Sequence, residues 1–253
     1  GIYLSAANGR LKVNAPAGAL DDSLKEVLRR RKPALLALLG QDARMRDEKP
    51  LVPLNTTGPI PLTAAQQSLW VAAQFTPEST AYSMPQAFLV EAPVSPDALR
   101  KAVAGLVRRH EILRTYFAIN DGEVAQMLAE DGDLPDEFTD LSGMDPGSRD
   151  AAGDEILRAA AKKPFDLLQP PLLRIHLIRL DEQRHLIFIN VHHIIADLHS
   201  LSILRSELLA LYVSAENGQT APLPPLPVQY RDYSIWERER LTEDLVQEQI
   251  AYW

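Results

Sequence analysis

Two adjacent histidines and one carboxylate stand close together in this chain. They are His192, His193 and Asp197, within the run VHHIIAD. An imidazole can accept or donate a proton near neutral pH, and a carboxylate can orient a cation or hold a helix end. The grouping is therefore typical of an acid–base site. A structural interpretation stays open beside it, because a histidine next to a buried strand often only satisfies its own hydrogen bonds.

The elements around these residues must place them at the end of a strand. Residues 184–191 (RHLIFINV) are almost uninterruptedly apolar, which predicts a strand buried on both faces. Side chains alternate along a strand, so His192 and His193 should point to opposite faces and only one can reach a given site. A helical stripe follows at Leu201, Leu204, Leu208 and Leu211, and the predicted helix runs to about Val213.

Two other chemistries fit the same residues less well. A zinc site would need ligands that converge, whereas adjacent strand histidines point apart and the chain has no cysteine. No second, spaced histidine cluster is present either, so we expect no metal. His199 and Ser200 suggest a Ser-His-Asp triad, but neighbours on a helix cannot form that line, and no G-x-S-x-G turn occurs.

The histidine run resembles the HHxxxDG signature of condensation domains of nonribosomal peptide synthetases, which belong to the chloramphenicol-acetyltransferase-like superfamily. Three further segments resemble motifs of that family, in the family's order. They are Leu62–Trp70 (SxAQxRLW, with Ser68 for the usual Arg), Arg109–Phe117 (RHExLRTxF at every specified position) and Tyr230–Trp236 (YxDFAxW, with conservative differences). The resemblance covers about residues 60 to 253.

The resemblance implies roles for the residues of the signature. His193 would position or deprotonate the nucleophile, and His192 would hold the loop by hydrogen bonding. Asp197 would pair with a buried arginine, with Arg109 as the first candidate and Arg114 as the second. Main-chain N–H groups at residues 198–200 would stabilise an oxyanion.

The chain departs from the signature at one point, since Leu198 stands where the family has glycine. Glycine would permit a positive φ or a close backbone approach to substrate, and leucine permits neither cheaply. Two interpretations stay open. Either the family tolerates the change when the nucleophile differs, or the chain represents a subtype with altered chemistry or a degenerate site.

The resemblance also implies a fold and a reaction. The fold is α/β, a chloramphenicol-acetyltransferase-like lobe in which helices flank a central mixed sheet. The complete domain would transfer an acyl group from a carrier-protein phosphopantetheine thioester to an amine or hydroxyl. We expect no directly bound cofactor, since the phosphopantetheine arrives on the partner. The family builds its channel from two lobes, and this chain stops where the second should begin, so we expect the fragment alone to be inactive.

A second resemblance covers the N-terminal residues. Asn8-Gly9 is a strong two-residue hairpin signal between the predicted strands 2–5 and 10–14, and two short helices should follow. This order resembles the TubC-type β-hairpin docking domains, in which a helix precedes the hairpin. Such a domain would receive the C-terminal linear motif of an upstream carrier protein as an added strand. The expected docking edge comprises Ile2, Tyr3, Leu4, Arg10, Leu11, Lys12 and Val13.

The remaining pattern predicts three regions: residues 1–40 as the docking domain, 41–60 as a Pro-containing linker, and 61–253 as the N-terminal lobe. Within the lobe we expect a helix from Pro96 to His110, strands at 114–119 and 123–128, an irregular excursion at 131–153 and a helix at 155–162. Paired strands should follow at 172–180 and 184–191. A Pro-rich crossover at 218–227 should lead to a helical C-terminus.

Composition limits the function classes. The net charge of −8 at pH 7 gives no support to nucleic-acid binding. No signal peptide or long apolar run is present, so we expect no membrane contact and a cytoplasmic location. Two hypotheses remain. The first is an acyl-transfer enzyme of carrier-protein-dependent peptide or hybrid polyketide assembly. The second is a non-catalytic docking and scaffold module that binds a carrier-protein motif.

Overall fold

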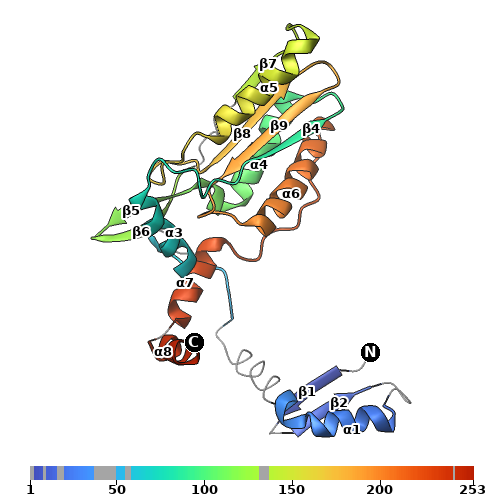
Figure 1. Ribbon diagram of the computed structural model, residues 1–253, viewed down its shortest axis with the longest axis vertical. Helices are drawn as coiled ribbons and strands as arrows, with labels where there is room; N and C mark the ends of the chain where they lie inside the picture. Colours follow the sequence, from blue (N-terminus) through green and yellow to red (C-terminus); the bar gives the residue numbers. More distant parts are fainter. Residues whose placement is uncertain are drawn as a thin grey trace. The chain divides into compact units, whose positions relative to one another are not determined.

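The computed structural model describes residues 3–7, 10–15, 20–36, 50–54, 58–130, 137–241 and 243–253. The chain divides into two compact units, Gly1–Pro50 and Leu51–Trp253 (Figure 1). Each unit is described by itself.

The first unit is a β-hairpin followed by helix. Strands β1 (Tyr3–Ala7) and β2 (Arg10–Asn14) pair antiparallel, and Leu4 lies opposite Val13. Helix α1 (Asp22–Arg30) begins where the Asp21 carboxylate accepts the Leu24 N–H over 2.7 Å, and residues 32–36 are again helical. The predicted order of hairpin and two helical segments is confirmed. Asn8, Gly9 and Ile2 lie outside the described residues.

The second unit is built on a four-stranded mixed sheet in the order β4-β9-β8-β7. Its strands are β4 (Gln86–Val90), β7 (Glu137–Asp140), β8 (Leu173–Arg179) and β9 (His185–Val191). Strand β7 runs parallel to β8, and the other two contacts are antiparallel. The predicted hairpin of β8 and β9 is confirmed.

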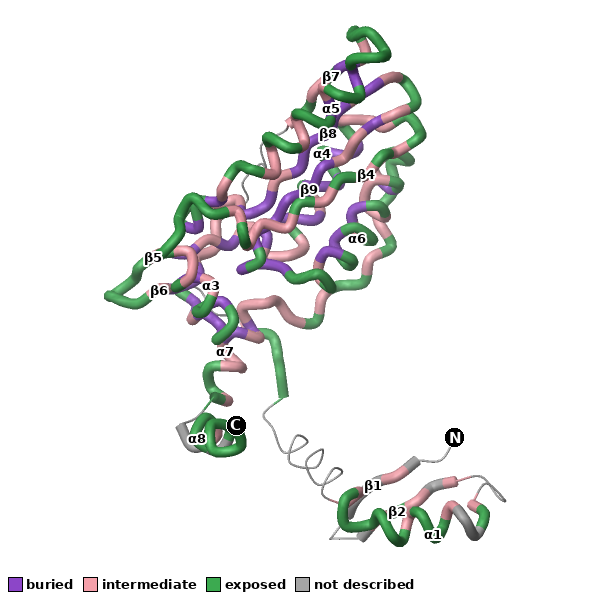
Figure 2. The backbone as a smooth tube through the Cα atoms, in the orientation of Figure 1, coloured by how far each residue is buried: buried purple, intermediate pink, exposed green. Residues whose placement is uncertain are grey.

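Helices cover both faces of this sheet, as the α/β prediction requires (Figure 1). Helices α4 (Pro96–Arg109) and α6 (Leu198–Glu216) share one hydrophobic core with the buried residues Leu173, Ile175 and Leu177 of β8. Helix α5 (Pro146–Ala161) packs on the opposite face, against Ile178 and its neighbours. The alternation along β8 thus assigns its side chains to two separate layers. Figure 2 shows buried residues along this strand.

A smaller sheet joins three strands in the order β3-β6-β5. They are β3 (Ile60–Pro61), β5 (Thr115–Asn120) and β6 (Glu123–Leu128). The last two confirm the strands predicted at 114–119 and 123–128, and the structure pairs them antiparallel. Around them lie α3 (Ala64–Phe75), the short 3-10 helix η1 (Glu111–Arg114) and α7 (Tyr230–Arg240), and α8 (Glu243–Tyr252) follows α7. This sheet and its helices carry three of the four motifs.

The prediction of an irregular excursion over residues 131–153 is wrong for most of its described part. Residues 137–140 form β7, and α5 begins at Pro146, where Asp145 caps the helix. Gly153 weakens the sequence signal for a helix, but the structure explains why a glycine stands there. A Cβ there would lie 3.0 Å from Leu186 Cδ1, so the glycine allows α5 to approach the sheet closely. Residues 131–136 lie outside the described part.

The described second part of the expected linker contacts the second unit. The Leu54 N–H donates to the Asp232 carboxylate over 2.8 Å, and Ile60 pairs with Gln126 of β6. Both partners are buried. At Leu54 and Ile60 the expected linker is therefore not a free spacer, contrary to what its prolines suggested.

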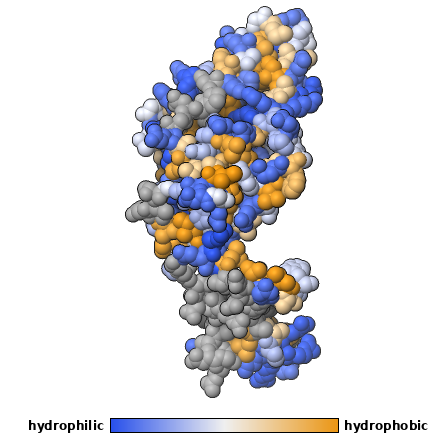
Figure 3. Space-filling view, turned by 90° about the vertical axis from the view of Figure 1, so that its left-hand side faces the viewer, coloured by the Kyte–Doolittle hydropathy of each residue, from blue (hydrophilic) through white to orange (hydrophobic). Residues whose placement is uncertain are grey.

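The surface of the second unit mixes polar and apolar side chains (Figure 3). Among the most exposed large apolar residues are Phe75, Ile119 and Leu198. Within the described part of the chain, no helix has the length and apolar character needed to cross a bilayer.

Candidate active site

The turn after β9 is held by main-chain hydrogen bonds. The His192 N–H donates to the Leu172 carbonyl over 3.0 Å, and the His193 N–H donates to the Tyr82 carbonyl over 2.8 Å. The Ile195 N–H returns to the His192 carbonyl over 3.1 Å. His192 is buried and His193 is exposed, as the alternation of side chains predicted. Of the two rings, the one that can meet a ligand is His193.

His192 holds the turn from inside. Its Nδ1 accepts the Ile194 N–H over 3.1 Å, and Phe165 lies against the ring edge at a centroid distance of 6.1 Å. Burial lowers the pKa of His192 to about 4, and the neighbouring His193 contributes to the same shift in a smaller degree. The ring is therefore neutral near pH 7 and can act as the acceptor that this hydrogen bond requires.

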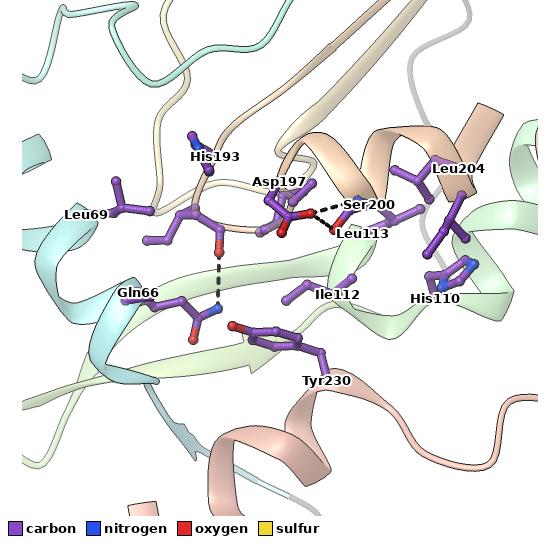
Figure 4. A pocket seen from close by; sticks show the side chains of 15 residues that line it. Gln66, Leu69, His110, Ile112, Leu113, His193, Asp197, Ser200, Leu204 and Tyr230 are labelled. Carbon is purple, nitrogen blue, oxygen red and sulfur yellow. Dashed lines mark hydrogen bonds between the residues drawn. The ribbon is translucent and has the colours of Figure 1, made fainter. Parts of the chain in front are cut away.

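A cavity of about 420 Å³ lies beside the turn, and all four motifs contribute to its wall (Figure 4). Helix α3 supplies Gln66 and Leu69, the second motif supplies His110 and Leu113, and α7 supplies Tyr230. The remaining lining residues are Ala65, Ile112, His193, Ile194, Ile195, Ala196, Asp197, Ser200, Ile203 and Leu204. Segments more than 160 positions apart in the sequence thus line the same cavity as His193.

The predicted pairing of Asp197 with an arginine is wrong. The Asp197 Oδ1 accepts both the Ser200 N–H, over 2.7 Å, and the Ser200 hydroxyl, over 2.6 Å, and so caps α6. These bonds, the side-chain one first, hold the pKa of Asp197 below its usual value. The carboxylate faces the amides of its own helix because Asp197 is the residue before the first turn.

The two candidate arginines have other partners. Arg109 Nε lies 3.0 Å from Glu207 Oε2, and His110 contacts the same oxygen. Burial alone would raise the pKa of Glu207, but the bonds from His110 and Arg109 hold it below its usual value. Arg114 donates to the Ala129 carbonyl over 2.8 Å. The arginines thus support the second motif and not the carboxylate of the signature.

The structure also bears on the amides proposed for an oxyanion and on Leu198. The Ser200 N–H is engaged by Asp197 and cannot serve a ligand at the same time.

Leu198 is the first residue of α6 and is 74% exposed. Among the described non-glycine residues only Asp121 has a positive φ, so the backbone at Leu198 does not require glycine.

Gln66 and Tyr230 belong to the cavity wall, although the sequence indicated a site role for neither of them. Gln66 and Tyr230 both stand at specified positions of motifs, which was the only signal available for them. The Tyr230 hydroxyl lies 3.3 Å from Thr63 Oγ1, and burial raises the pKa of Tyr230. Among the described residues, no cluster of three or more His, Asp or Glu could hold a metal ion.

The sequence of the cavity-forming unit matches a known family over nearly its whole length. Residues 56–253 match the family described as "Condensation domain". The chain belongs to the condensation-domain family. Residues 1–41 match the "TubC N-terminal docking domain".

Curated relatives of this condensation domain are peptide synthetases. The chain is 37% identical over 218 residues to one of the linear gramicidin synthase proteins of Brevibacillus parabrevis, covering 86% of this chain and 4% of that protein. It is 39% identical over 196 residues to phosphinothricin tripeptide synthetase PhsC of Streptomyces viridochromogenes, covering 78% and 18%. Bacitracin synthase 2 of Bacillus licheniformis is 31% identical over 256 residues, covering 100% and 9%. The chain therefore spans a small part of these proteins.

Solved structures share the fold. The condensation domain for chain release from the enacyloxin polyketide synthase matches with a TM-score of 0.69 and 28% identity, covering 100% of this chain and 48% of that chain. The EpoB cyclization-docking bidomain from Sorangium cellulosum matches with a TM-score of 0.70 and 27% identity, covering 100% and 49%. The condensation-domain unit has the chloramphenicol-acetyltransferase-like fold, and the chain spans about half the length of these solved chains.

Proposed function

We propose that this chain supplies the His193 half of an acyl-transfer site, which a second lobe completes. The complete domain joins a carrier-protein-bound acyl thioester to an amine or hydroxyl. The observation that carries this proposal is the convergence of four distant motifs on one cavity in which the signature imidazole is exposed.

The chemistry of the step suits an exposed imidazole. The nucleophile's lone pair attacks the thioester carbonyl, a C–N or C–O bond forms, and the C–S bond breaks to release the pantetheine thiol. The nucleophile must lose one proton and the departing sulfur must gain one. His193 is the proposed group that orients the nucleophile or accepts that proton.

The proposed oxyanion donors are the main-chain N–H groups of Leu198 and His199. They belong to the first turn of α6, where N–H groups of a helix lack intrahelical acceptors and the helix dipole favours negative charge. Ser200 is removed from the set proposed on sequence grounds, because its N–H is bonded to Asp197.

The docking unit is proposed to recruit the upstream carrier protein. Strands β1 and β2 form a two-stranded sheet, so each has an outer edge whose main-chain groups can pair with an extended peptide. The proposed ligand is the carrier protein's C-terminal linear motif, and phosphopantetheine enters only on that partner. Of the proposed edge, Ile2 lies outside the described residues.

The test is a comparison of His193→Ala with His199→Ala in the two-lobed protein that continues this chain. His199→Ala removes an exposed imidazole on α6 that does not line the cavity, and it keeps the main-chain N–H proposed as an oxyanion donor, so it is the matched control for loss of a ring. We expect His193→Ala to lower the rate of product formation by about 100-fold or more, in line with loss of a general base, and His199→Ala to retain it. Unchanged product formation by His193→Ala would favour the non-catalytic docking module instead.

A further inference from the structure

A chain of buried amide hydrogen bonds reaches the turn that carries His193. Gln66 on α3 is 1% exposed and Gln126 on β6 is 2% exposed. The Gln66 Nε2 donates to the Ile194 carbonyl over 3.2 Å, the bond drawn in Figure 4, and to Gln126 Oε1 over 3.0 Å. The Gln126 Nε2 donates to the Pro61 carbonyl over 2.8 Å and to Ser234 Oγ over 2.9 Å. We call Gln66, Gln126 and Ser234 the amide relay.

The direction of donation along the amide relay is fixed. The main-chain carbonyls of Ile194 and Pro61 can only accept, so each glutamine must turn its NH₂ group toward one of them. The Gln66 Oε1 also accepts the Thr63 N–H over 3.1 Å, which completes the capping box of α3. Reversing either amide would set two oxygens against each other in a buried place, where such contacts are costly. The relay therefore has one arrangement.

The amide relay connects the turn to another motif through a side chain. The N–H groups of His192 and His193 bond to main-chain carbonyls, and the Ile194 N–H bonds to the His192 ring. The Ile194 carbonyl, by contrast, accepts from the Gln66 side chain of the first motif. Since Ile194 directly follows His193, a shift of this carbonyl would move the backbone from which the His193 ring projects.

We propose that Gln66 and Gln126 are positioning residues for His193. Gln66 fixes the turn directly, and Gln126 acts through Gln66 by holding its amide in the donating orientation. Gln126 lies outside all four motifs, so the relay adds a residue of β6 to the support of the site. The inference rests on the function proposed above for His193.

The sharpest test is Gln66→Glu compared with Gln67→Glu in the two-lobed protein. Both changes replace an amide by a carboxyl, but Gln67 is exposed at an unspecified position of the same motif. Gln66→Glu removes both N–H donors and leaves an oxygen against the Ile194 carbonyl. We expect kcat to fall by about 10- to 100-fold with KM for the acyl carrier protein unchanged, as a small misplacement of a catalytic group does. Gln67→Glu should match the wild type.

The pH profile separates positioning from a general loss of structure. A buried glutamate has a raised pKa, and when protonated it again offers one donor to Ile194. The ratio of kcat for Gln66→Glu to kcat for the wild type should therefore rise severalfold between about pH 8 and about pH 6. His192 is the titratable group bonded to the turn, and Tyr230 is the one bonded to Thr63. Burial lowers the pKa of the first to about 4 and raises that of the second, so both stay neutral in this range.

Ser234→Ala is a milder second variant that removes only one acceptor of Gln126. We expect a folded protein with kcat lowered by about two- to fivefold and KM unchanged. A wild-type kcat in both Gln66→Glu and Ser234→Ala would overturn the relay, as would a pH-independent ratio for Gln66→Glu. If His193→Ala is itself fully active, the proposed function fails instead, so the two failures are distinguishable.

Discussion

His192 and His193 are neighbours in the sequence with opposite environments. His192 is 6% exposed and accepts a main-chain hydrogen bond through Nδ1, whereas His193 is exposed in the cavity wall. The first ring must be neutral to accept that bond, because a protonated imidazole has no acceptor. One ring of the pair thus holds the turn, and the other is exposed at the cavity.

His192 should make the second unit sensitive to acid. Folding lowers the pKa of His192 from 6.5 to about 4, so between these values the unfolded chain binds a proton that the folded chain excludes. The contribution of His192 is complete above about pH 6.5 and is lost as the pH falls toward 4, by up to about 3 kcal/mol. Urea unfolding across this range should show a steeper loss of the free energy of unfolding in the wild type than in His192→Asn. Asparagine keeps an acceptor but does not titrate.

The control for this measurement is Ser202→Asn, at an exposed position on α6 that carries no titratable group before or after the change. Its pH dependence should follow the wild type. Parallel curves for the wild type and His192→Asn would contradict the neutral, buried His192.

At the scale of elements, α6 begins directly after the signature, and its first turn is capped by Asp197. The Asp197 carboxylate accepts the Ser200 N–H, which is the defining bond of an N-cap. We expect Asp197→Ala to lower the free energy of unfolding by about 1 kcal/mol, whereas Asp197→Ser should retain most of it because serine also caps well. Chemical denaturation of the three proteins checks this. Equal losses for Ala and Ser would mean that the charge, and not the cap, is what stabilises the turn.

Helix α7 is tied to the segment before β3 by Asp232. This carboxylate is 2% exposed and accepts the Leu54 N–H over 2.8 Å and the Gln229 N–H over 2.7 Å. Asp232→Ala would leave both donors without their acceptor, which should cost about 2 to 4 kcal/mol of unfolding free energy. Hydrogen exchange at the Leu54 amide should quicken at the same time. Asp232→Asn, which keeps one acceptor oxygen, should lose less, and wild-type protection at Leu54 in Asp232→Ala would contradict the proposed tie.

The elements that the sequence predicted well are those with clear local signals. Strands β8 and β9 are themselves largely apolar runs, and α4 begins at Pro96 after the cap Ser95. Strand β4 and the first turns of α5 were missed because their signals are weak. Residues 86–90 alternate between half-buried and exposed at a sheet edge, and the glycine in α5 serves a contact with Leu186 that is distant in sequence.

At the scale of the whole molecule, the site depends on contacts that no local pattern shows. The four motifs indicated the family and the histidine turn, but not that Gln126 of β6 holds Gln66, nor that Arg109 faces Glu207. These are pairings between residues about 60 to 100 positions apart. Each local signature was compatible with several partners, and only the packing of the sheets and helices selects one.

The division into two units leads to a prediction about recruitment. Residues Gly1–Pro50 and Leu51–Trp253 are separate compact units, and the cavity is lined entirely by the second. Removing residues 1–50 from the two-lobed protein should leave its melting temperature and its kcat on a small pantetheine thioester unchanged. The KM for a separately supplied upstream carrier protein should rise by about 10-fold or more, because a docked partner gains effective concentration at the site.

A second variant keeps the unit but introduces Leu4→Pro on the hairpin, where proline removes a main-chain donor from strand β1 and restricts its φ angle. Leu4→Pro should also raise the KM for the upstream carrier protein and should leave kcat on the small thioester unchanged. An unchanged KM in both proteins would show that recruitment uses a surface of the second unit.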